Sequence, residues 1–315
     1  MDKSPLSIVF LDAYSLGNVN ISALEALGKW TPYETTKPDQ VVERCKEADI
    51  VITNKVKLMK SELDALPGLK LICIAATGMN NVDLRVAAEK GIPVKNVADY
   101  STDSVAELTF TLALGLIHKS HYYDQYVKSG AYSNSGRFTH HGRPFFEIKG
   151  KKWGIIGMGH IGSRVAEMAS VFGARVSYYS TSGRNLDAGY RHLALDELLA
   201  DSDIVSIHAP LNEKTRYLLD FEKLCLMKPE AYLINVGRGG IVRESDLARA
   251  LRENRLAGAG LDVFEQEPVD LGNPLLMSDI NEKLLFTPHV AWASAEARQR
   301  LVDTIVGHIK KHFGI

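Results

Sequence analysis

Three residues in the C-terminal half carry side chains suited to anion binding and proton transfer. Arg238 follows Leu233-Ile-Asn-Val-Gly237, Glu267 lies in Leu261-Asp-Val-Phe-Glu-Gln-Glu-Pro268, and His289 follows Leu285-Phe-Thr-Pro. A guanidinium can hold the oxygens of a keto acid, an imidazole can supply a proton near neutral pH, and a carboxylate can orient the imidazole. Each residue alone also has a simpler explanation, because a histidine after Thr-Pro is often a capping or surface residue and a glutamate before proline is usually solvated.

A glycine-rich turn, Gly157-Met-Gly159-His-Ile-Gly162, separates an apolar run at 153–156 from a helical pattern at 163–172. Strand, turn and helix in this order are typical of a dinucleotide site. Gly157 permits the tight turn, Gly159 lets the backbone approach a pyrophosphate, and Gly162 lets the helix pack on the strand. The pyrophosphate then faces the helix N-terminus. A glycine-rich turn without a ligand is the alternative, and the flanking elements disfavour it.

The next apolar run, 175–179, ends in Ser180-Thr181-Ser182-Gly183-Arg184 without an acidic residue. An Asp or Glu at this point would bind the ribose 2′-OH and repel a 2′-phosphate, whereas Ser180, Thr181 and Arg184 could accommodate that phosphate. The sequence therefore favours NADP or dual use slightly over NAD alone. It is equally open that Arg184 is a solvated loop residue.

The elements that must position these residues follow one rhythm. Helical patterns at 163–172, 245–253 and 295–308 alternate with short runs that are apolar on both faces, as expected for buried parallel strands. The sequence thus predicts an α/β fold with doubly wound parallel sheets, and 315 residues suggest about two domains. A further long helix is expected from 101 to about 118, followed by an irregular excursion at 129–152. The expected strands lie at 7–11, 50–53, 71–75, 153–156, 175–179, 204–208, 232–236, 257–261 and 284–287.

Composition limits the classes of partner. Lys and Arg number 37 against 38 Asp and Glu, so no surface charge favours nucleic acid or anionic membrane. The apolar stretch 105–117 is too short to span a bilayer and contains Glu107, and 1–14 lacks the features of a signal peptide. We expect a cytoplasmic protein. A metal site at His118, His140 and His141 has little support, because adjacent histidines point in different directions, and we expect no metal.

Four stretches of this chain together form a recognisable set. They are Gly157-Met-Gly-His-Ile-Gly162, Asn235-Val-Gly-Arg-Gly-Gly-Ile-Val242, Gly260-Leu-Asp-Val-Phe-Glu-Gln-Glu-Pro268 and Thr287-Pro-His-Val-Ala-Trp-Ala-Ser294. In order and spacing they resemble the D-isomer-specific 2-hydroxyacid dehydrogenase family, and the resemblance covers essentially the whole chain. Residues 100–107 with Trp292 resemble its glycerate dehydrogenase/hydroxypyruvate reductase branch.

The resemblance implies hydride transfer between NAD(P)H and a small 2-keto acid, with hydroxypyruvate/D-glycerate or glyoxylate/glycolate as the expected pairs. Arg238, Glu267 and His289 match the family's catalytic set, in which the histidine protonates the carbonyl oxygen and the glutamate holds its tautomer. Arg238 is also expected to contact the substrate. The loop with Thr77, Gly78 and Met79 matches the one whose backbone N–H groups grip the substrate carboxylate, although a β-turn after a strand fits these residues too.

The same resemblance implies a cofactor-binding set. Thr102 and Asp262 match positions near the nicotinamide, and His208-Ala-Pro210 matches a stretch that lines the cofactor. The whole expected set is Thr102, Gly157, Gly159, His160, Ile161, Gly162, Ser180, Thr181, Arg184, His208, Ala209, Pro210, Thr215, Val236, Gly237, Asp262 and His289.

The fold implied by the resemblance has two α/β domains with a cleft between them. A discontinuous substrate domain, 1–100 plus 289–315, would flank a cofactor domain at 101–288, through which the family generally dimerises. Two positions depart from the family pattern: Ser180 stands where NAD-preferring members have an acid, and Arg243 stands where many relatives have Asp. Glu267 is retained, which argues against the formate dehydrogenase branch, where Gln is expected. A nucleotide-sensing, corepressor-like binding protein on the same scaffold is the alternative function.

Overall fold

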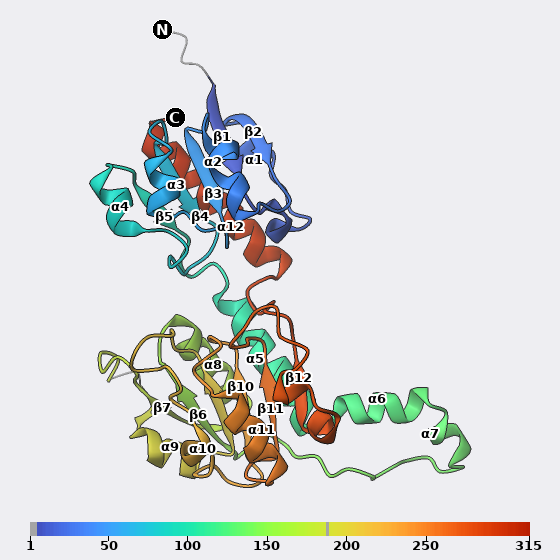
Figure 1. Ribbon diagram of the computed structural model, residues 1–315. Coiled ribbons are helices and arrows are strands. Elements are labelled where there is room, and N and C mark those ends of the chain that lie inside the picture. Colours follow the sequence, from blue (N-terminus) through green and yellow to red (C-terminus); the bar gives the residue numbers. More distant parts are fainter. Residues whose placement is uncertain (1–4, 187–188) are drawn as a thin grey trace. The chain divides into compact units, whose positions relative to one another are not determined.

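The computed structural model describes residues 5–186 and 189–315, and the chain divides into two compact units (Figure 1). One unit joins Met1–Ser101 to Ala293–Ile315, and the other comprises Thr102–Trp292. The chain re-enters the first unit after Trp292 rather than after residue 288. His289 therefore belongs to the same unit as Arg238 and Glu267.

The first unit contains a five-stranded parallel sheet in the order β2-β1-β3-β4-β5. The three inner strands are almost wholly buried, whereas β2 and β5 form the partly exposed edges. Helix α12 packs against β4 and α1 through apolar residues that recur about every four positions, such as Leu301, Ile305 and Ile309. The strands are β1 (Leu6–Phe10), β2 (Gly28–Pro32), β3 (Ile50–Thr53), β4 (Leu71–Ile74) and β5 (Val94–Asn96). The helices are η1 (Ala13–Leu16), α1 (Ser22–Glu25), η2 (Pro38–Gln40), α2 (Val41–Cys45), α3 (Lys60–Asp64), α4 (Leu84–Glu89) and α12 (Ala295–Phe313).

The second unit contains a seven-stranded parallel sheet in the order β12-β11-β10-β9-β6-β7-β8. Strand order reverses between β6 and β9, so the ligand crevice of this sheet is expected at their carboxyl ends. The strands are β6 (Lys152–Ile156), β7 (Arg175–Tyr179), β8 (Arg191–His192), β9 (Ile204–Ile207), β10 (Tyr232–Asn235), β11 (Gly258–Leu261) and β12 (Leu284–Phe286). The helices are α5 (Thr102–Ile117), α6 (Ser120–Lys128), α7 (Ala131–Asn134), α8 (His160–Val171), α9 (Leu195–Asp201), α10 (Phe221–Leu224), α11 (Glu244–Arg252), η3 (Pro274–Leu276) and η4 (Ser278–Lys283).

Two hydrophobic clusters cover the two faces of this seven-stranded sheet. One joins the inner strands to α5 and α8, where the ring of Phe110 lies 4.7 Å from that of the fully buried Trp153. The other joins them to α9, α10 and α11 through leucines such as Leu198, Leu224 and Leu247. Helices on both faces of a parallel sheet confirm the predicted fold class, two parallel-sheet α/β units.

Helices α6 and α7, with the extended segment 135–147, form a projection that we call the arm (Figure 1). Neither α6 nor α7 has a buried residue. Part of the excursion at 129–152 is thus helical, as α7, although this four-residue helix has no apolar repeat that would indicate it in the sequence. Among the described residues, no helix is long and apolar enough to cross a membrane.

Candidate active site

The imidazole of His289 and the carboxylate of Glu267 meet in the second unit. Nδ1 of His289 lies 2.7 Å from Oε2 of Glu267, and both side chains are partly exposed. The backbone N–H of Phe264 donates to the other carboxylate oxygen of Glu267 at 3.2 Å. An ionised carboxylate accepts a hydrogen bond from Nδ1–H, so this contact selects the tautomer whose Nε2 can exchange a proton with a ligand.

Asp262 holds the segment that carries His289. It follows β11 and is fully buried, and its carboxylate accepts bonds from Thr287 Oγ1 (2.6 Å) and from the backbone N–H groups of Val290 and Ala291 (2.9 Å each). Burial raises the pKa of Asp262 above its usual value, and these three bonds oppose the rise. The backbone N–H of His289 also donates to the Asp262 carbonyl at 2.8 Å. The carboxylate and the carbonyl of Asp262 thus hold the loop that carries His289.

Arg238 lies on the loop after β10, which Asn235 shapes from within. The Asn235 amide donates to the Arg238 carbonyl at 3.1 Å and accepts from the N–H of Gly237 at 3.1 Å. Val236 beside it is buried, whereas Arg238 is exposed and its guanidinium donates to the Gly237 carbonyl at 2.8 Å. The loop therefore presents a cation to solvent.

The three candidate catalytic residues come from neighbouring strands. β10, β11 and β12 lie side by side, and Arg238, Glu267 and His289 follow their carboxyl ends in that order. The structure brings Glu267 and His289 into contact. The loop of Arg238 packs against that of Glu267, because a Cβ added at Gly239 would lie 1.7 Å from the carbonyl oxygen of Phe264.

The glycine turn joins β6 to α8 and opens onto a cavity of about 630 Å³. Gly157 has φ +95°, and a Cβ at Gly162 would lie 2.1 Å from the Gly157 carbonyl oxygen, so both positions require glycine. A Cβ at Gly159 would meet nothing within 4 Å. Gly159 thus leaves open the space that a pyrophosphate would occupy, and His160 and Ile161 begin the helix beside it.

Ser180, Thr181 and Arg184 line the same cavity. The lining also includes residues outside the expected set, among them Lys214, from the loop after β9, and Asn185, whose amide donates to the Met158 carbonyl at 2.5 Å. For Lys214 a signal was available, because β9 flanks β6 at the point where strand order reverses. Asn185 follows β7 instead. The charged residues of this lining are Arg184, Lys214 and Glu213.

His208 lines this cavity with a half-buried side chain whose Nδ1 atom is inaccessible to solvent. Its Nε2 lies 3.0 Å from Ser206 Oγ, which accepts a bond from Trp153 Nε1 at 2.9 Å. Within the part of the chain that the structure describes, its Nδ1 has no hydrogen-bond partner. Burial lowers the pKa of His208 to about 3, so the ring is neutral at physiological pH. A buried polar atom without a partner beside a cavity is suited to bind a ligand.

The remaining expected cofactor residues shape the loop after β9 or lie at helix starts. Buried Thr215 donates through Oγ1 to the Pro210 carbonyl at 2.6 Å and accepts from the N–H of Asn212 at 2.8 Å. Ala209 is buried, and Thr102 is the first residue of α5. The hydroxyl of Thr215 therefore supports the cavity wall, which Pro210 lines.

The expected substrate loop lies in the first unit, after β4. Thr77 donates through Oγ1 to the Val97 carbonyl at 3.0 Å, and its own carbonyl accepts from the Asn96 amide at 2.7 Å. Met79, one residue after Gly78, packs against the core of this unit. These contacts tie the loop to the end of β5.

The histidines of the arm are engaged with aromatic rings. Nε2 of His140 lies 2.8 Å from the hydroxyl of Tyr122, and its ring stacks on Tyr126 with centroids 3.8 Å apart. The ring of His118 lies 5.7 Å from that of Phe145. In residues 5–186 and 189–315 no three His, Cys, Asp or Glu side chains are grouped as a metal would require.

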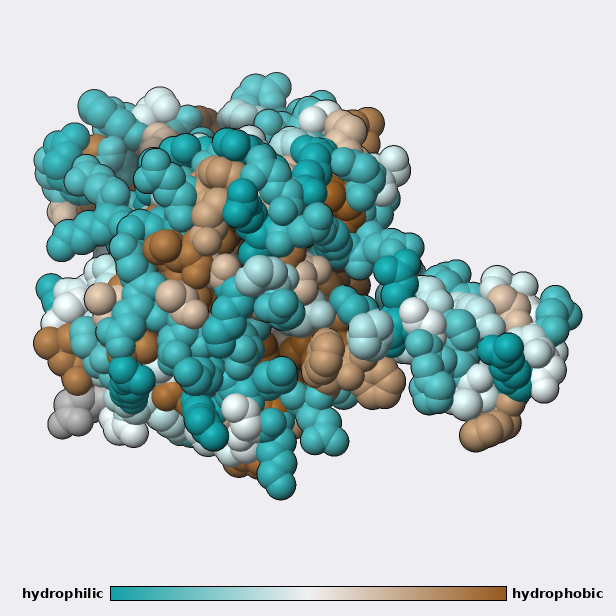
Figure 2. All heavy atoms as spheres, turned by 90° about the horizontal axis from the view of Figure 1, so that it is seen from below, coloured by the Kyte–Doolittle hydropathy of each residue, from teal (hydrophilic) through white to brown (hydrophobic). Residues whose placement is uncertain are grey.

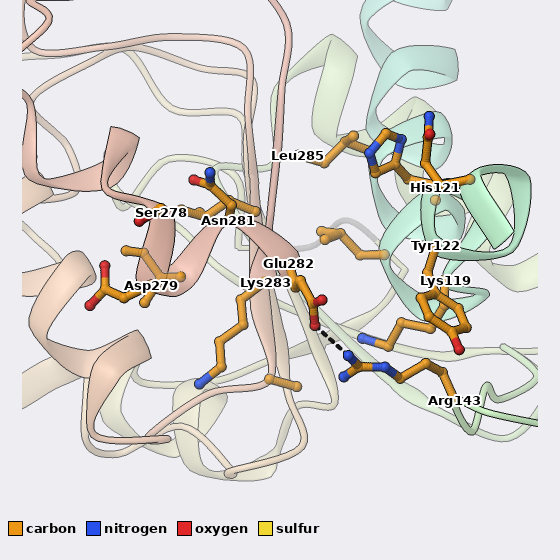
Figure 3. A pocket seen from close by; sticks show the side chains of 16 residues that line it. Lys119, His121, Tyr122, Arg143, Ser278, Asp279, Asn281, Glu282, Lys283 and Leu285 are labelled. Carbon is orange, nitrogen blue, oxygen red and sulfur yellow. Dashed lines mark hydrogen bonds and ion pairs between the residues drawn. The ribbon is translucent and has the colours of Figure 1, made fainter. Parts of the chain in front are cut away.

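A second cavity, of about 550 Å³, lies where the arm joins the body of the second unit. Figure 3 shows Tyr122 and Arg143 on the arm side and Lys283 on the η4 side, with Arg143 paired to Glu282 at 2.5 Å. Phe138, Phe145 and Phe146 of the arm segment are exposed to solvent, Phe138 by 92%. Figure 2 shows hydrophobic surface at the outer end of the arm and beside its base. The arm therefore combines aromatic surface with an adjoining hollow.

Comparison with known proteins gives one consistent family. Residues 110–291 match the family described as D-isomer specific 2-hydroxyacid dehydrogenase, NAD binding domain. The chain is 35% identical to a hydroxypyruvate reductase of Blautia hydrogenotrophica, over 97% of this chain and 96% of the relative. It is 36% identical to a glycerate dehydrogenase of Methylorubrum extorquens, over 96% and 95%. An NADPH-dependent glyoxylate/hydroxypyruvate reductase of Sinorhizobium meliloti, solved with NADP and malonate, superposes with TM-score 0.83 at 28% identity, over 98% and 94%.

Proposed function

The chain belongs to the D-isomer specific 2-hydroxyacid dehydrogenase family, and on that premise we propose that it reduces a small 2-keto acid to the 2-hydroxy acid with NADPH or NADH. The observation that carries the proposal is the hydrogen-bonded pair of His289 and Glu267 at the carboxyl edge of a sheet that also builds a dinucleotide cradle. The names of the relatives favour hydroxypyruvate or glyoxylate as the keto acid.

Each catalytic side chain has a distinct task in this reaction. A reduced nicotinamide, when bound, would provide the hydride for the keto carbon. His289 would donate a proton from Nε2 to the carbonyl oxygen, so that the C=O bond becomes a CH–OH group and the imidazolium becomes neutral imidazole. Glu267 holds the ring through Nδ1, and Arg238 offers a cation to the substrate's oxygens.

The cofactor is assigned to the second unit. Gly157, Gly159 and the start of α8 would receive the pyrophosphate, and the unpartnered Nδ1 of His208 would bond to the cofactor beside them. We assign the loop of Thr77, Gly78 and Met79 in the first unit to the substrate carboxylate, as the resemblance implies.

We propose a preference for NADPH or dual use. Support comes from two cations, Arg184 and Lys214, that line the cavity together with Ser180 and Thr181. Strand β7 ends without a carboxylate to repel a 2′-phosphate, although Glu213 lies in the same lining and opposes phosphate binding. The balance between the two cations and Glu213 sets the relative affinity for NADPH and NADH.

We further propose that the protein is a homodimer through the arm of the cofactor unit. Exposed Phe138, Phe145 and Phe146 are the kind of side chains that interfaces bury, and a helix without any buried residue needs a partner to stabilise it. A cytoplasmic location remains a prediction from the sequence.

The test is steady-state oxidation of NADPH and of NADH with hydroxypyruvate, glyoxylate and pyruvate. Turnover with hydroxypyruvate supports both the reaction and the branch. Cofactor binding without turnover of any keto acid would contradict the proposal and favour the nucleotide-sensing alternative. Size-exclusion chromatography with light scattering, repeated on a Phe138→Ser/Phe145→Ser variant, tests the dimer.

A further inference from the structure

Glu244 and Glu265 bind each other's backbone in a reciprocal pair. The N–H of Glu244, at the start of α11, donates to Glu265 Oε1 at 2.7 Å, and the N–H of Glu265 donates to Glu244 Oε1 at 2.5 Å. The second oxygen of each carboxylate is also bonded, Glu244 Oε2 to the Asn273 amide (2.5 Å) and Glu265 Oε2 to the Tyr217 hydroxyl (3.1 Å). We call this arrangement the glutamate clasp.

The clasp lies next to the catalytic pair and is electrostatically costly. Glu244 is 8% exposed, and its pKa is raised chiefly by burial and further by the carboxylates of Glu265 and Glu267, against the bonds from Glu265 and Asn273. Burying a carboxylate beside two others opposes folding. The position nevertheless needs two acceptor oxygens, because Glu244 receives one bond from the N–H of Glu265 and one from the Asn273 amide, and a glutamine would offer only one acceptor.

The clasp joins the two loops that carry catalytic candidates. Glu265 is two residues from Glu267 and adjoins Phe264, whose N–H donates to the Glu267 carboxylate. Glu244 begins the helix that follows the Arg238 loop, and the N–H of Tyr217 donates to the Gly240 carbonyl of that loop at 2.7 Å. Glu244 is thus connected to Glu267 by two hydrogen bonds of the same loop, one from the N–H of Glu265 to Glu244 and one from the N–H of Phe264 to Glu267.

We propose that Glu244 is a positioning residue that, through Glu265, fixes the 264–267 segment so that the carboxylate of Glu267 faces Nδ1 of His289. The inference rests on the proposed function, since its consequence for rate requires that His289 and Glu267 act in hydride transfer. Glu253, at the other end of α11, is an exposed glutamate that pairs only with Arg249 and Arg255 among the ion pairs of the described chain. It provides the matched control.

The first test needs no turnover. In protein labelled with ¹⁵N-histidine, the Nδ1-bound proton of His289 gives a low-field NMR signal, assigned by its absence in His289→Gln. We expect Glu244→Ala to remove or displace this signal and Glu253→Ala to preserve it. An unchanged signal in a folded Glu244→Ala protein would overturn the proposal. If that variant does not fold, Glu244→Asp, whose shorter side chain sets the carboxylate back from the N–H of Glu265, replaces it with the same expectation.

The second test is a double-mutant cycle on kcat, with cofactor affinity measured in parallel. We expect Glu244→Ala to lower kcat about tenfold without changing the cofactor Kd, and to have no further effect in a Glu267→Gln background, because it acts through that residue. Equal losses in both backgrounds would indicate a structural role only and refute the inference. Lack of turnover by the unmodified protein would instead refute the proposed function. The NMR signal would still show whether Glu244 positions Glu267 against His289.

Discussion

Nδ1 of His289 lies 2.7 Å from Oε2 of Glu267, although the two residues are 22 positions apart on loops that follow different strands. The loops are neighbours because β11 and β12 pair in parallel, with Leu261 opposite Phe286. The contact orients the imidazole so that its Nε2 is available to donate a proton.

His289→Gln should lower kcat by about 10²–10⁴-fold, because general acid catalysis contributes about that much to such reactions. Cofactor affinity, measured by fluorescence titration, should stay within a factor of a few. His312→Gln, on the exposed end of α12, is the control and should leave kcat unchanged. A rate that survives His289→Gln would remove this residue from proton transfer.

Arg184→Ala should raise KM for NADPH about tenfold and leave KM for NADH nearly unchanged, because only NADPH carries the 2′-phosphate that a guanidinium would bind. The exposed Arg191, which pairs with Glu197 and is absent from the cavity lining, serves as control. Equal effects on both cofactors would mean that Arg184 is a solvated loop residue.

Gly159→Val and Gly162→Val should both lose cofactor affinity, but only Gly162→Val should also lose stability. A side chain at Gly159 enters open space, so the variant should fold with an unchanged Tm yet lose cofactor affinity by about 100-fold or more. A Cβ at Gly162 would meet the Gly157 carbonyl at 2.1 Å, so that variant should lose stability as well. Calorimetry measures the loss of stability and cofactor titration the loss of affinity. Normal cofactor binding by Gly159→Val would contradict the proposed pyrophosphate site at this turn.

Asp262→Asn should both destabilise the protein and lower kcat. An amide cannot accept all three of the bonds from Thr287, Val290 and Ala291, and a buried donor without a partner costs about 1–3 kcal/mol. Because these bonds hold the segment with His289, kcat should fall even below the melting transition. Asp303→Asn, on the exposed surface of α12, is the control and should change neither stability nor kcat. An Asp262→Asn enzyme with an unchanged kcat would show that the position of His289 does not depend on these bonds.

Asp203→Asn should lower stability at neutral pH but not in acid. Burial tends to raise the pKa of Asp203, but bonds from the Lys152 N–H (2.8 Å) and Lys228 (2.7 Å) outweigh it, so the pKa is lowered overall. A lowered pKa stabilises the fold above the unfolded value near 3.8, and this contribution is lost as pH falls through the folded value. Urea unfolding should show a difference of roughly 1 kcal/mol at pH 7 that shrinks below pH 4.

The matched control for that measurement is Asp124→Asn. Asp124 pairs with Lys128 on the exposed surface of α6, and such pairs contribute little to stability. A difference for Asp203→Asn that stayed constant from pH 7 to pH 3 would contradict the assignment of its effect to the ionised carboxylate.

Most strands were predictable because each contains a short run of mainly apolar residues. β3 and β7 begin and end where the apolar runs do, and β4, β9, β10 and β12 each end one residue earlier. The strands that were missed, β2, β5 and β8, all lie at sheet edges, where half-exposed or polar residues such as Arg191 and His192 remove the apolar signal. β12 also lies at an edge, but its sequence Leu284–Phe286 is wholly apolar and was therefore recognised. An edge strand without such a run is defined only by its pairing to a neighbour, which the local sequence does not contain.

The sequence by itself determined the chemistry available to this protein. The glycine turn, the arginine, glutamate and histidine motifs and the missing acid after β7 are local facts, since residue type and spacing fix which groups can bind phosphate or exchange protons. Only the tertiary structure decided how those groups are used. It pairs His289 with Glu267 and ties Asp262 to the segment after β12. It also engages Thr215 within its own loop, adds Lys214 to the cavity and sets Glu244 against Glu265. The reason is that a hydrogen bond depends on distance and direction, and strand order brings distant residues together in ways that spacing along the chain does not encode.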